Sequence, residues 1–202
     1  GNSTSGVAIE NGATRNHVQG NFIGTRNAGM GDLGNRFDGV FVSNSAMNTI
    51  GGAQLGAGNV IAGNDSDGID IRGAGATDNS VQGNLIGTDA TGTTALGNQE
   101  FGVVVFDGSS SNLIGGGESA ARNVISASGF SGIGIVGSGS DRNIVAGNFI
   151  GTDALGTTAL SNTNRGVDIF GGAKFNVVGS NGDGVTDRAE QNVISGNGWD
   201  GV

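Results

Sequence analysis

Residues 68–87 read GIDIRGAGATDNSVQGNLIG and carry three short signals in a fixed order. A glycine opens an alternating apolar run at Ile69 and Ile71, and one asparagine precedes each of two further short runs, at Asn79 and Asn84. Alternation with a period of two is typical of a strand with one buried face, whereas glycine and asparagine are typical of turns. The stretch therefore predicts three short strands joined by tight corners.

The same three signals recur along the whole chain. The glycine-led runs begin at Gly6, Gly39, Gly68, Gly102, Gly132 and Gly166, the first asparagines are Asn16, Asn48, Asn79, Asn112, Asn143 and Asn176, and the second are Asn21, Asn59, Asn84, Asn123, Asn148 and Asn192. The distance from the first to the second asparagine is 5, 11, 5, 11, 5 and 16 residues, so two kinds of coil alternate. Such a repeat indicates a solenoid.

Strands this short become stable only when identical strands of successive coils pair above one another, about 4.8 Å apart. We therefore predict one all-β domain over residues 1–202, a parallel β-helix of about six coils with three strands of about four residues in each. The general preference for right-handed crossovers predicts a right-handed helix. Within the first strand, Ile69 and Ile71 should face the interior and Asp70 the outside, and the recurrent asparagines should stack into hydrogen-bonded ladders.

Composition excludes several classes of function. The chain has 43 glycines among 202 residues, no proline, no cysteine, one histidine and a net charge of −9. The negative charge opposes binding to nucleic acid and to anionic lipid, and no apolar run approaches the roughly 20 residues that a membrane span needs. Without cysteine, and with His17 expected on the surface, zinc sites and Ser-His-Asp triads are excluded.

The pattern resembles the parallel β-helix repeats of the pectin-lyase-like superfamily. It is especially similar to repeat arrays of large bacterial surface proteins, in which phrases such as Asn84-Leu85-Ile86-Gly87-Thr88-Asp89 and Asn192-Val193-Ile194-Ser195-Gly196-Asn197 recur. This resemblance covers essentially the whole chain and implies the right-handed solenoid. It also implies that any enzymatic site would act on acidic polysaccharides at the outer face of the first sheet. One fold hosts many activities, so the resemblance is weak evidence for function.

The best candidate for catalysis is an acidic group with one base. Asp38 and Asp67 precede the first strand on adjacent coils, and Asp70 and Arg72 belong to that strand. Carboxylates this close can split their pKa values or hold a metal. The alternative interpretation is that Asp38, Asp67 and also Asp200 bond locally to the turn that enters the strand.

A calcium site is a separate expectation for the long turn Gly179–Glu190. Its residues follow the spacing of an EF-hand loop, with Gly184 at the sixth position and a departure at Gly179, which stands where the first ligand belongs. The expected ligands are Asn181, Asp183, the Val185 carbonyl, Asp187 and Glu190. The alternative is a polar surface excursion that binds nothing.

These observations favour a non-catalytic structural or adhesive segment of a secreted or cell-surface bacterial protein. The alternatives are a polysaccharide lyase or hydrolase that uses Asp38, Asp67, Asp70 and Arg72, and a glycan-binding module without turnover. The first seven and last seven residues match in the phase of the repeat, so we expect a fragment of a longer array. Expected partners are other coils or domains of the same protein, surface glycans and neighbouring copies.

Overall fold

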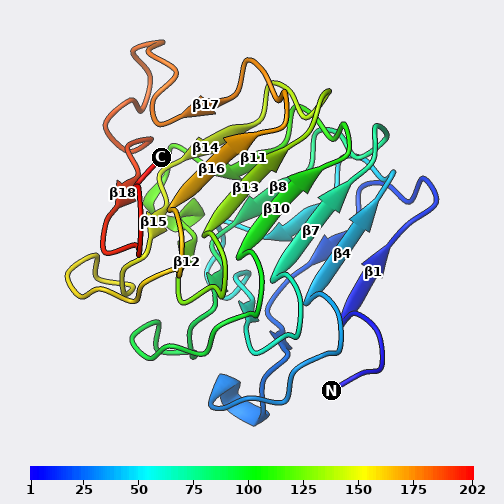
Figure 1. Ribbon diagram of the computed structural model, residues 1–202, viewed down its shortest axis with the longest axis vertical. Helices are drawn as coiled ribbons and strands as arrows, with labels where there is room; N and C mark the ends of the chain where they lie inside the picture. The colour runs from blue at the N-terminus through cyan, green and yellow to red at the C-terminus, as the bar shows by residue number, and fades with distance from the viewer.

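The chain winds repeatedly through three parallel sheets and forms a β-solenoid (Figure 1). The computed structural model describes residues 1–202 and contains 18 strands, six in each sheet. Six strands in one sheet are separated by five complete turns, so the solenoid has about five full coils, close to the predicted six. The only helical segments are the short η1 (Asn27–Gly29) and η2 (Ser119–Ala121), and no helix has the length and hydrophobicity needed to cross a membrane.

Every coil passes through the first, second and third sheet in the same order. The first sheet consists of β1 (Val7–Ile9), β4 (Val40–Ser43), β7 (Ile69–Arg72), β10 (Val103–Phe106), β13 (Ile133–Val136) and β16 (Val167–Phe170). The second consists of β2 (His17–Val18), β5 (Thr49–Gly51), β8 (Ser80–Gln82), β11 (Leu113–Gly115), β14 (Ile144–Ala146) and β17 (Val177–Val178). The third consists of β3 (Phe22–Ile23), β6 (Val60–Ile61), β9 (Leu85–Ile86), β12 (Val124–Ile125), β15 (Phe149–Ile150) and β18 (Val193–Ile194).

The interior is a column of aliphatic side chains in register from coil to coil. In the first sheet the first strand residues pair in the order Val7, Val40, Ile69, Val103, Ile133 and Val167. Apart from Val7, which is partly buried and packs against it, these residues belong to one core cluster of 21 buried residues that includes their counterparts from the other two sheets. Burying each valine or isoleucine side chain contributes about 1.5–3 kcal/mol, which is how strands of two to four residues become stable together. The predicted parallel fold and inward alternation are confirmed.

The strands of the second and third sheets are shorter than the predicted four residues. They have two or three residues, whereas five of the six strands of the first sheet have four. Gly87 shows why the third strand stops early, because its φ of +79° leaves the extended conformation. A Cβ there would lie 1.8 Å from the Ser126 carbonyl oxygen of the next coil, so only glycine fits this corner.

Two asparagine ladders run along the solenoid as predicted. In each ladder the Nδ2 of one asparagine donates to the Oδ1 of its counterpart on the next coil, at 2.9–3.1 Å. The first ladder joins Asn16, Asn48, Asn79, Asn112, Asn143 and Asn176, and the second joins Asn21, Asn59, Asn84, Asn123, Asn148 and Asn192. The central members are completely buried, so the ladders satisfy polar groups that would otherwise destabilise the corners.

A third ladder lies at the corner that leads into the first sheet, and the sequence analysis missed it. Its members stand four positions before each glycine that opens a first-sheet strand. It joins Asn2, Asn35, Asn64 and Asn98, is interrupted at Ser128, and resumes from Asn162 to Asn197. The constant spacing of four residues was the signal that could have revealed it.

Ser128→Asn should complete this third ladder and raise the free energy of unfolding by about 1 kcal/mol. The Ser128 Oγ is buried without a hydrogen-bond partner. An asparagine Nδ2 at this position would donate to Asn162 Oδ1, which already accepts the Ser128 backbone N–H at 3.0 Å. Urea unfolding of the two proteins measures the difference.

Ser128→Ala is the matched control, because it removes the unpartnered hydroxyl without adding an amide. Its free energy of unfolding should lie within about 0.5 kcal/mol of the wild type. A Ser128→Asn variant less stable than Ser128→Ala would show that the ladder does not extend through this coil.

Candidate functional site

The outer face of the first sheet carries two columns of side chains in register. The first column is formed by the second residue of each strand and contains Ala8, Phe41, Asp70, Val104, Gly134 and Asp168. The second column contains Ser43, Arg72, Phe106, Val136 and Phe170. Both columns face outward, as predicted for Asp70, so the strand geometry brings Asp70 and Arg72 to the same side of β7.

Asp38 and Asp67 occupy the same corner on successive coils, directly before the glycines that open β4 and β7. The backbone N–H of Asp67 donates to Asp38 Oδ1 at 3.3 Å, and the N–H of Phe101 donates to Asp67 Oδ1 at 2.8 Å. Each carboxylate therefore accepts from the next coil, and not from its own turn as the local-bond interpretation expected. Asp200, the third residue of that interpretation, accepts from Arg165 Nε at 3.3 Å.

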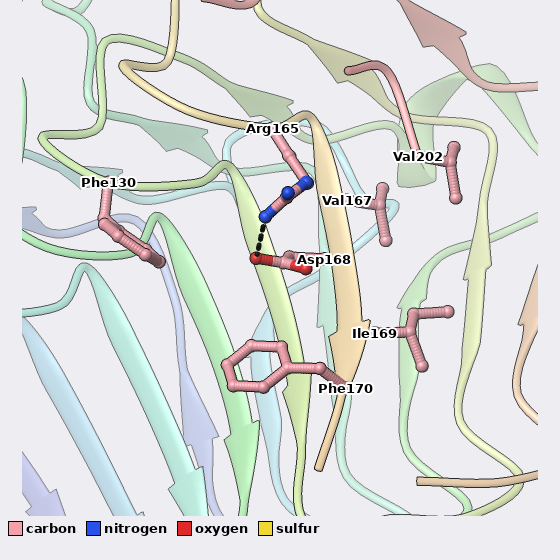
Figure 2. A pocket seen from close by; sticks show the side chains of 7 residues that line it. All are labelled: Phe130, Arg165, Val167, Asp168, Ile169, Phe170 and Val202. Carbon is pink, nitrogen blue, oxygen red and sulfur yellow. Dashed lines mark hydrogen bonds and ion pairs between the residues drawn. The ribbon is translucent and has the colours of Figure 1, made fainter. Parts of the chain in front are cut away.

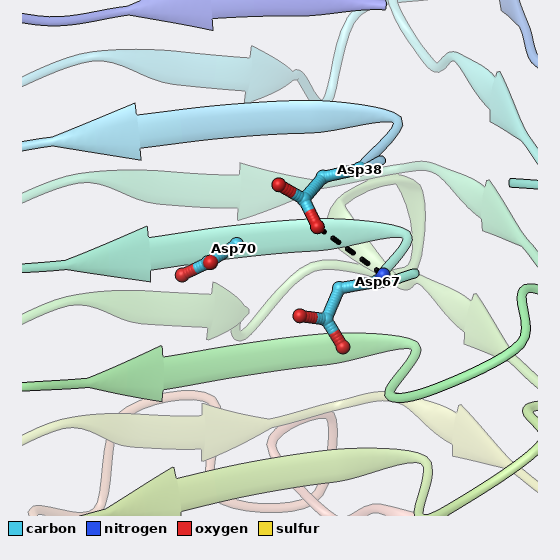
Figure 3. Close-up of side chains that lie close together, drawn as sticks. All are labelled: Asp38, Asp67 and Asp70. Atoms are coloured by element: carbon cyan, nitrogen blue, oxygen red, sulfur yellow. Dashed lines mark hydrogen bonds between the residues drawn. The ribbon is translucent and has the colours of Figure 1, made fainter. Parts of the chain in front are cut away.

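Three carboxylates meet at this place on the outer wall (Figure 3). One oxygen from each of Asp38, Asp67 and Asp70 lies within 4.8 Å of the other two. The residues are 7%, 4% and 0% exposed, respectively. The structure thus brings together the three acidic residues predicted from sequence, and it buries all of them.

Arg72 is the only cation that contacts this acidic cluster. Its guanidinium forms an ion pair with Asp70 Oδ2 and lies over the rings of Phe41 and Phe106, with its Cζ 5.2 and 5.8 Å from their centroids. Asp70 Oδ1 and Arg72 Nε are buried and have no hydrogen-bond partner. One arginine therefore faces three carboxyl groups.

Burial changes the acidity of the cluster. Removal from water is the main cause that raises the pKa of Asp67 to about 8; the hydrogen bond from Phe101 opposes the rise, and the charges of Asp70 and Asp38 add to it. Burial also raises the pKa of Asp70 to about 6, opposed by Arg72. Asp67 therefore holds a proton at neutral pH.

One edge of the cluster reaches a cavity on the outer face. This cavity of about 210 Å³ is lined by Asp67 and Arg72 together with aromatic side chains that include Phe101 and Phe106. Asp70 does not line it. The carboxyl groups of the cluster can bind protons or a small cation. Acid–base catalysis on a polymer would instead require carboxyl groups that reach the substrate.

A second hollow of about 570 Å³ lies at the last strand of the first sheet (Figure 2). Asp168 and Phe170 are on one side of β16, and Val167 and Ile169 are on the other. Arg165 Nη1 binds Asp168 at 3.2 Å. The residues that line this hollow therefore come both from the outer face of the first sheet and from the end of the aliphatic core. Arg165 enters from the turn that precedes β16, and the repeat pattern did not predict its place here.

The predicted calcium loop, residues 179–190, is an exposed excursion whose side chains bind its own backbone. Asp183 Oδ1 accepts the Val185 N–H at 2.7 Å, Asp187 Oδ2 accepts the Gly184 N–H at 3.2 Å, and Glu190 Oε2 accepts the Asn181 N–H at 3.1 Å. Its acidic residues do not form a group of three carboxylates within ligand distance. Calcium binding in this loop stays a prediction.

Comparison with known proteins does not identify a family for this chain. No protein-family model, curated protein or solved structure matches the chain. The β-solenoid is shown by the structure itself, and the resemblance to the pectin-lyase-like superfamily stays a prediction.

Proposed function

We propose that this chain is a non-catalytic structural or adhesive segment of a secreted or cell-surface bacterial protein. The observation that carries the proposal is the continuity of its stacking, since two asparagine ladders extend from the first coil to the last without a break. Side chains that serve only to join coils favour a rigid spacer. Its partners would be other coils or domains of the same protein, surface glycans or neighbouring copies.

Burial of the three candidate catalytic carboxyl groups also supports a role without turnover. A lyase or hydrolase would need Asp38, Asp67, Asp70 and Arg72 to contact a polysaccharide. Asp70 is completely buried and its Oδ2 is paired with Arg72. Bringing it to a substrate would require the outer wall to open.

A panel of acidic polysaccharides, including pectin, polygalacturonate and alginate, tests the proposal. We expect neither new unsaturated ends nor new reducing ends after long incubation with the protein, with or without calcium. Depolymerisation that is abolished by Asp70→Asn, in a variant with an unchanged circular dichroism spectrum, would contradict the proposal and establish the lyase or hydrolase alternative.

Glycan binding without turnover is the second candidate, and it is favoured by the aromatic side chains of the outer face. Phe106, Phe130 and Phe170 are 40%, 39% and 45% exposed. Exposed aromatic rings offer flat apolar surfaces beside polar groups, a combination suited to sugar rings. Retention of the protein on the same polysaccharides distinguishes this candidate, because it requires binding where the spacer alone requires none.

A further inference from the structure

We propose that the outer face of the third sheet binds a segment of a separate protein that presents an arginine between aliphatic side chains. A hollow of about 800 Å³ lies on this face, larger than the two described above, and none of its lining residues is charged. Its floor is formed by Phe22 of β3, Val60 of β6 and Leu85 of β9, which pair in register on three successive coils. A site here is independent of the spacer function, which needs no partner on this face.

The chain itself contains a filled counterpart of this hollow, two coils further along. The turns 48–59 and 112–123 have the same length, so their residues correspond one to one, and β9, β12 and β15 form the floor of the counterpart. There Arg122 extends over the floor, with its Cζ 4.1 Å from the centroid of the Phe149 ring, and its Nε donates to the Gly147 carbonyl at 3.0 Å. Arg122 forms no ion pair, so an aromatic ring and a carbonyl hold its guanidinium without a carboxylate.

The open hollow lacks this arginine because Gly58 stands at the position of Arg122. A Cβ at Gly58 would lie 2.0 Å from the Gly83 carbonyl oxygen, so this turn cannot supply a side chain of its own. Gly83 corresponds to Gly147, and its carbonyl accepts no hydrogen bond within the chain. The aromatic ring stands at the other end of this floor, at Phe22, which is 52% exposed. The open hollow therefore offers a ring and a carbonyl, as its counterpart does, but no guanidinium.

The rim of the open hollow is also more apolar than the rim of its counterpart. Leu55 is fully exposed on this rim, at the position where the corresponding turn has Ser119. Leu55 and Phe22 are thus two large apolar side chains that the fold leaves largely in water on one hollow. Contiguous exposed apolar surface marks interaction sites, and here it suits the aliphatic neighbours of the incoming arginine.

Charge favours a basic partner over an acidic one. The chain carries a net charge of −9, which attracts a cationic segment and disfavours an anionic one. Among cations, arginine is more weakly hydrated than lysine, and its planar guanidinium stacks on aromatic rings. An uncharged hollow with an exposed phenylalanine therefore favours arginine.

NMR titration of protein with isotope-labelled leucine and valine methyl groups tests the site. The probe is the blocked tripeptide acetyl-Leu-Arg-Leu-amide, compared with acetyl-Leu-Gln-Leu-amide. We expect saturable shifts of the Leu55, Val60 and Leu85 methyl signals, and binding of the glutamine peptide about fivefold weaker or more, because it lacks the cation that stacks on Phe22. Absence of shifts at about 10 mM arginine peptide, which would saturate a site of even millimolar affinity, overturns the proposal. Equal binding of the two peptides also overturns it.

Two variants exchange residues of the hollow for those of its counterpart. Leu55→Ser should weaken binding of the arginine peptide about threefold or more, because it removes apolar contact area at a fully exposed position. Phe22→Leu keeps the floor apolar and should abolish the preference for arginine over glutamine.

Leu155→Ser is the matched control, since Leu155 is an exposed leucine of the loop 151–162 and lies outside the hollow. It should bind the arginine peptide as the wild type does. Unchanged binding in Leu55→Ser, or an equal loss in Leu155→Ser, overturns the site. Shifts of the same methyl signals on raising the protein concentration alone would also overturn it, because they would assign the hollow to a second copy of this chain.

Discussion

At pH 9, with divalent cations removed by a chelator, Asp67→Asn should raise the free energy of unfolding by about 4–6 kcal/mol. The pKa of Asp67 is raised to about 8, chiefly by burial, from an ordinary value of 3.8. A carboxyl group that holds its proton more tightly when folded contributes stability at low pH, and this contribution is lost as the pH rises through 8. Asparagine stays neutral at every pH and keeps an oxygen for the Phe101 N–H.

The pH dependence is the decisive measurement for this variant. Between pH 5 and 8 one such group lowers the free energy of unfolding by up to about 1.4 kcal/mol per pH unit, and the variant should lack this slope. Near pH 4 the two proteins should be about equally stable. Asp65→Asn, at an exposed position of the same turn, is the control and should keep the wild-type slope. Parallel curves for wild type and Asp67→Asn would contradict the prediction.

Asn84→Ala should lower the free energy of unfolding by about 3 kcal/mol. Asn84 is completely buried in the middle of the second ladder. Its Oδ1 accepts from the N–H and the Nδ2 of Asn59, and its Nδ2 donates to the Ile50 carbonyl and to Asn123 Oδ1. Alanine removes four hydrogen bonds and leaves several of these buried partners unsatisfied, which costs about 1–3 kcal/mol for each group.

Asn21→Ala tests the same ladder at its exposed first position. There water can replace the lost bonds, so the change should stay below about 1 kcal/mol. Urea unfolding at neutral pH gives both values. Equal losses at Asn84 and Asn21 would show that the ladder is not what stabilises the interior corners.

The sequence predicts the strands of the first sheet well, because the opening glycine and the alternating apolar residues recur in every copy of the repeat. Glycine before the strand is required there, as at Gly68, where a Cβ would lie 2.8 Å from Asn98 Nδ2. The alternation of Ile69, Asp70 and Ile71 then assigns each side chain to a face. Strand lengths in the other sheets could not be predicted, because they depend on close approaches between coils at corners such as Gly87.

The sequence predicts which acidic residues form the cluster, but it does not predict that all three are buried. Adjacent coils place Asp38 and Asp67 one level apart, and alternation turns Asp70 to the same side. Their burial depends on side chains of neighbouring turns, such as Phe101 of the next coil beside Asp67, whose positions the repeat does not determine. For the loop of residues 179–190, ligand spacing alone could not reveal that its carboxylates bind its own backbone.

The alternating coils give one further consequence, which concerns how such a chain can change in length. Gly68 and Gly132 stand at equivalent places two coils apart, and their strands pair with the neighbouring strands in the same way. An in-frame duplication of residues 68–131 would therefore supply each new coil with matching neighbours on both sides. Insertion of one residue within β7 would instead turn Ile71 outward. Such a chain can therefore lengthen by whole pairs of coils without disturbing the pairing of its strands.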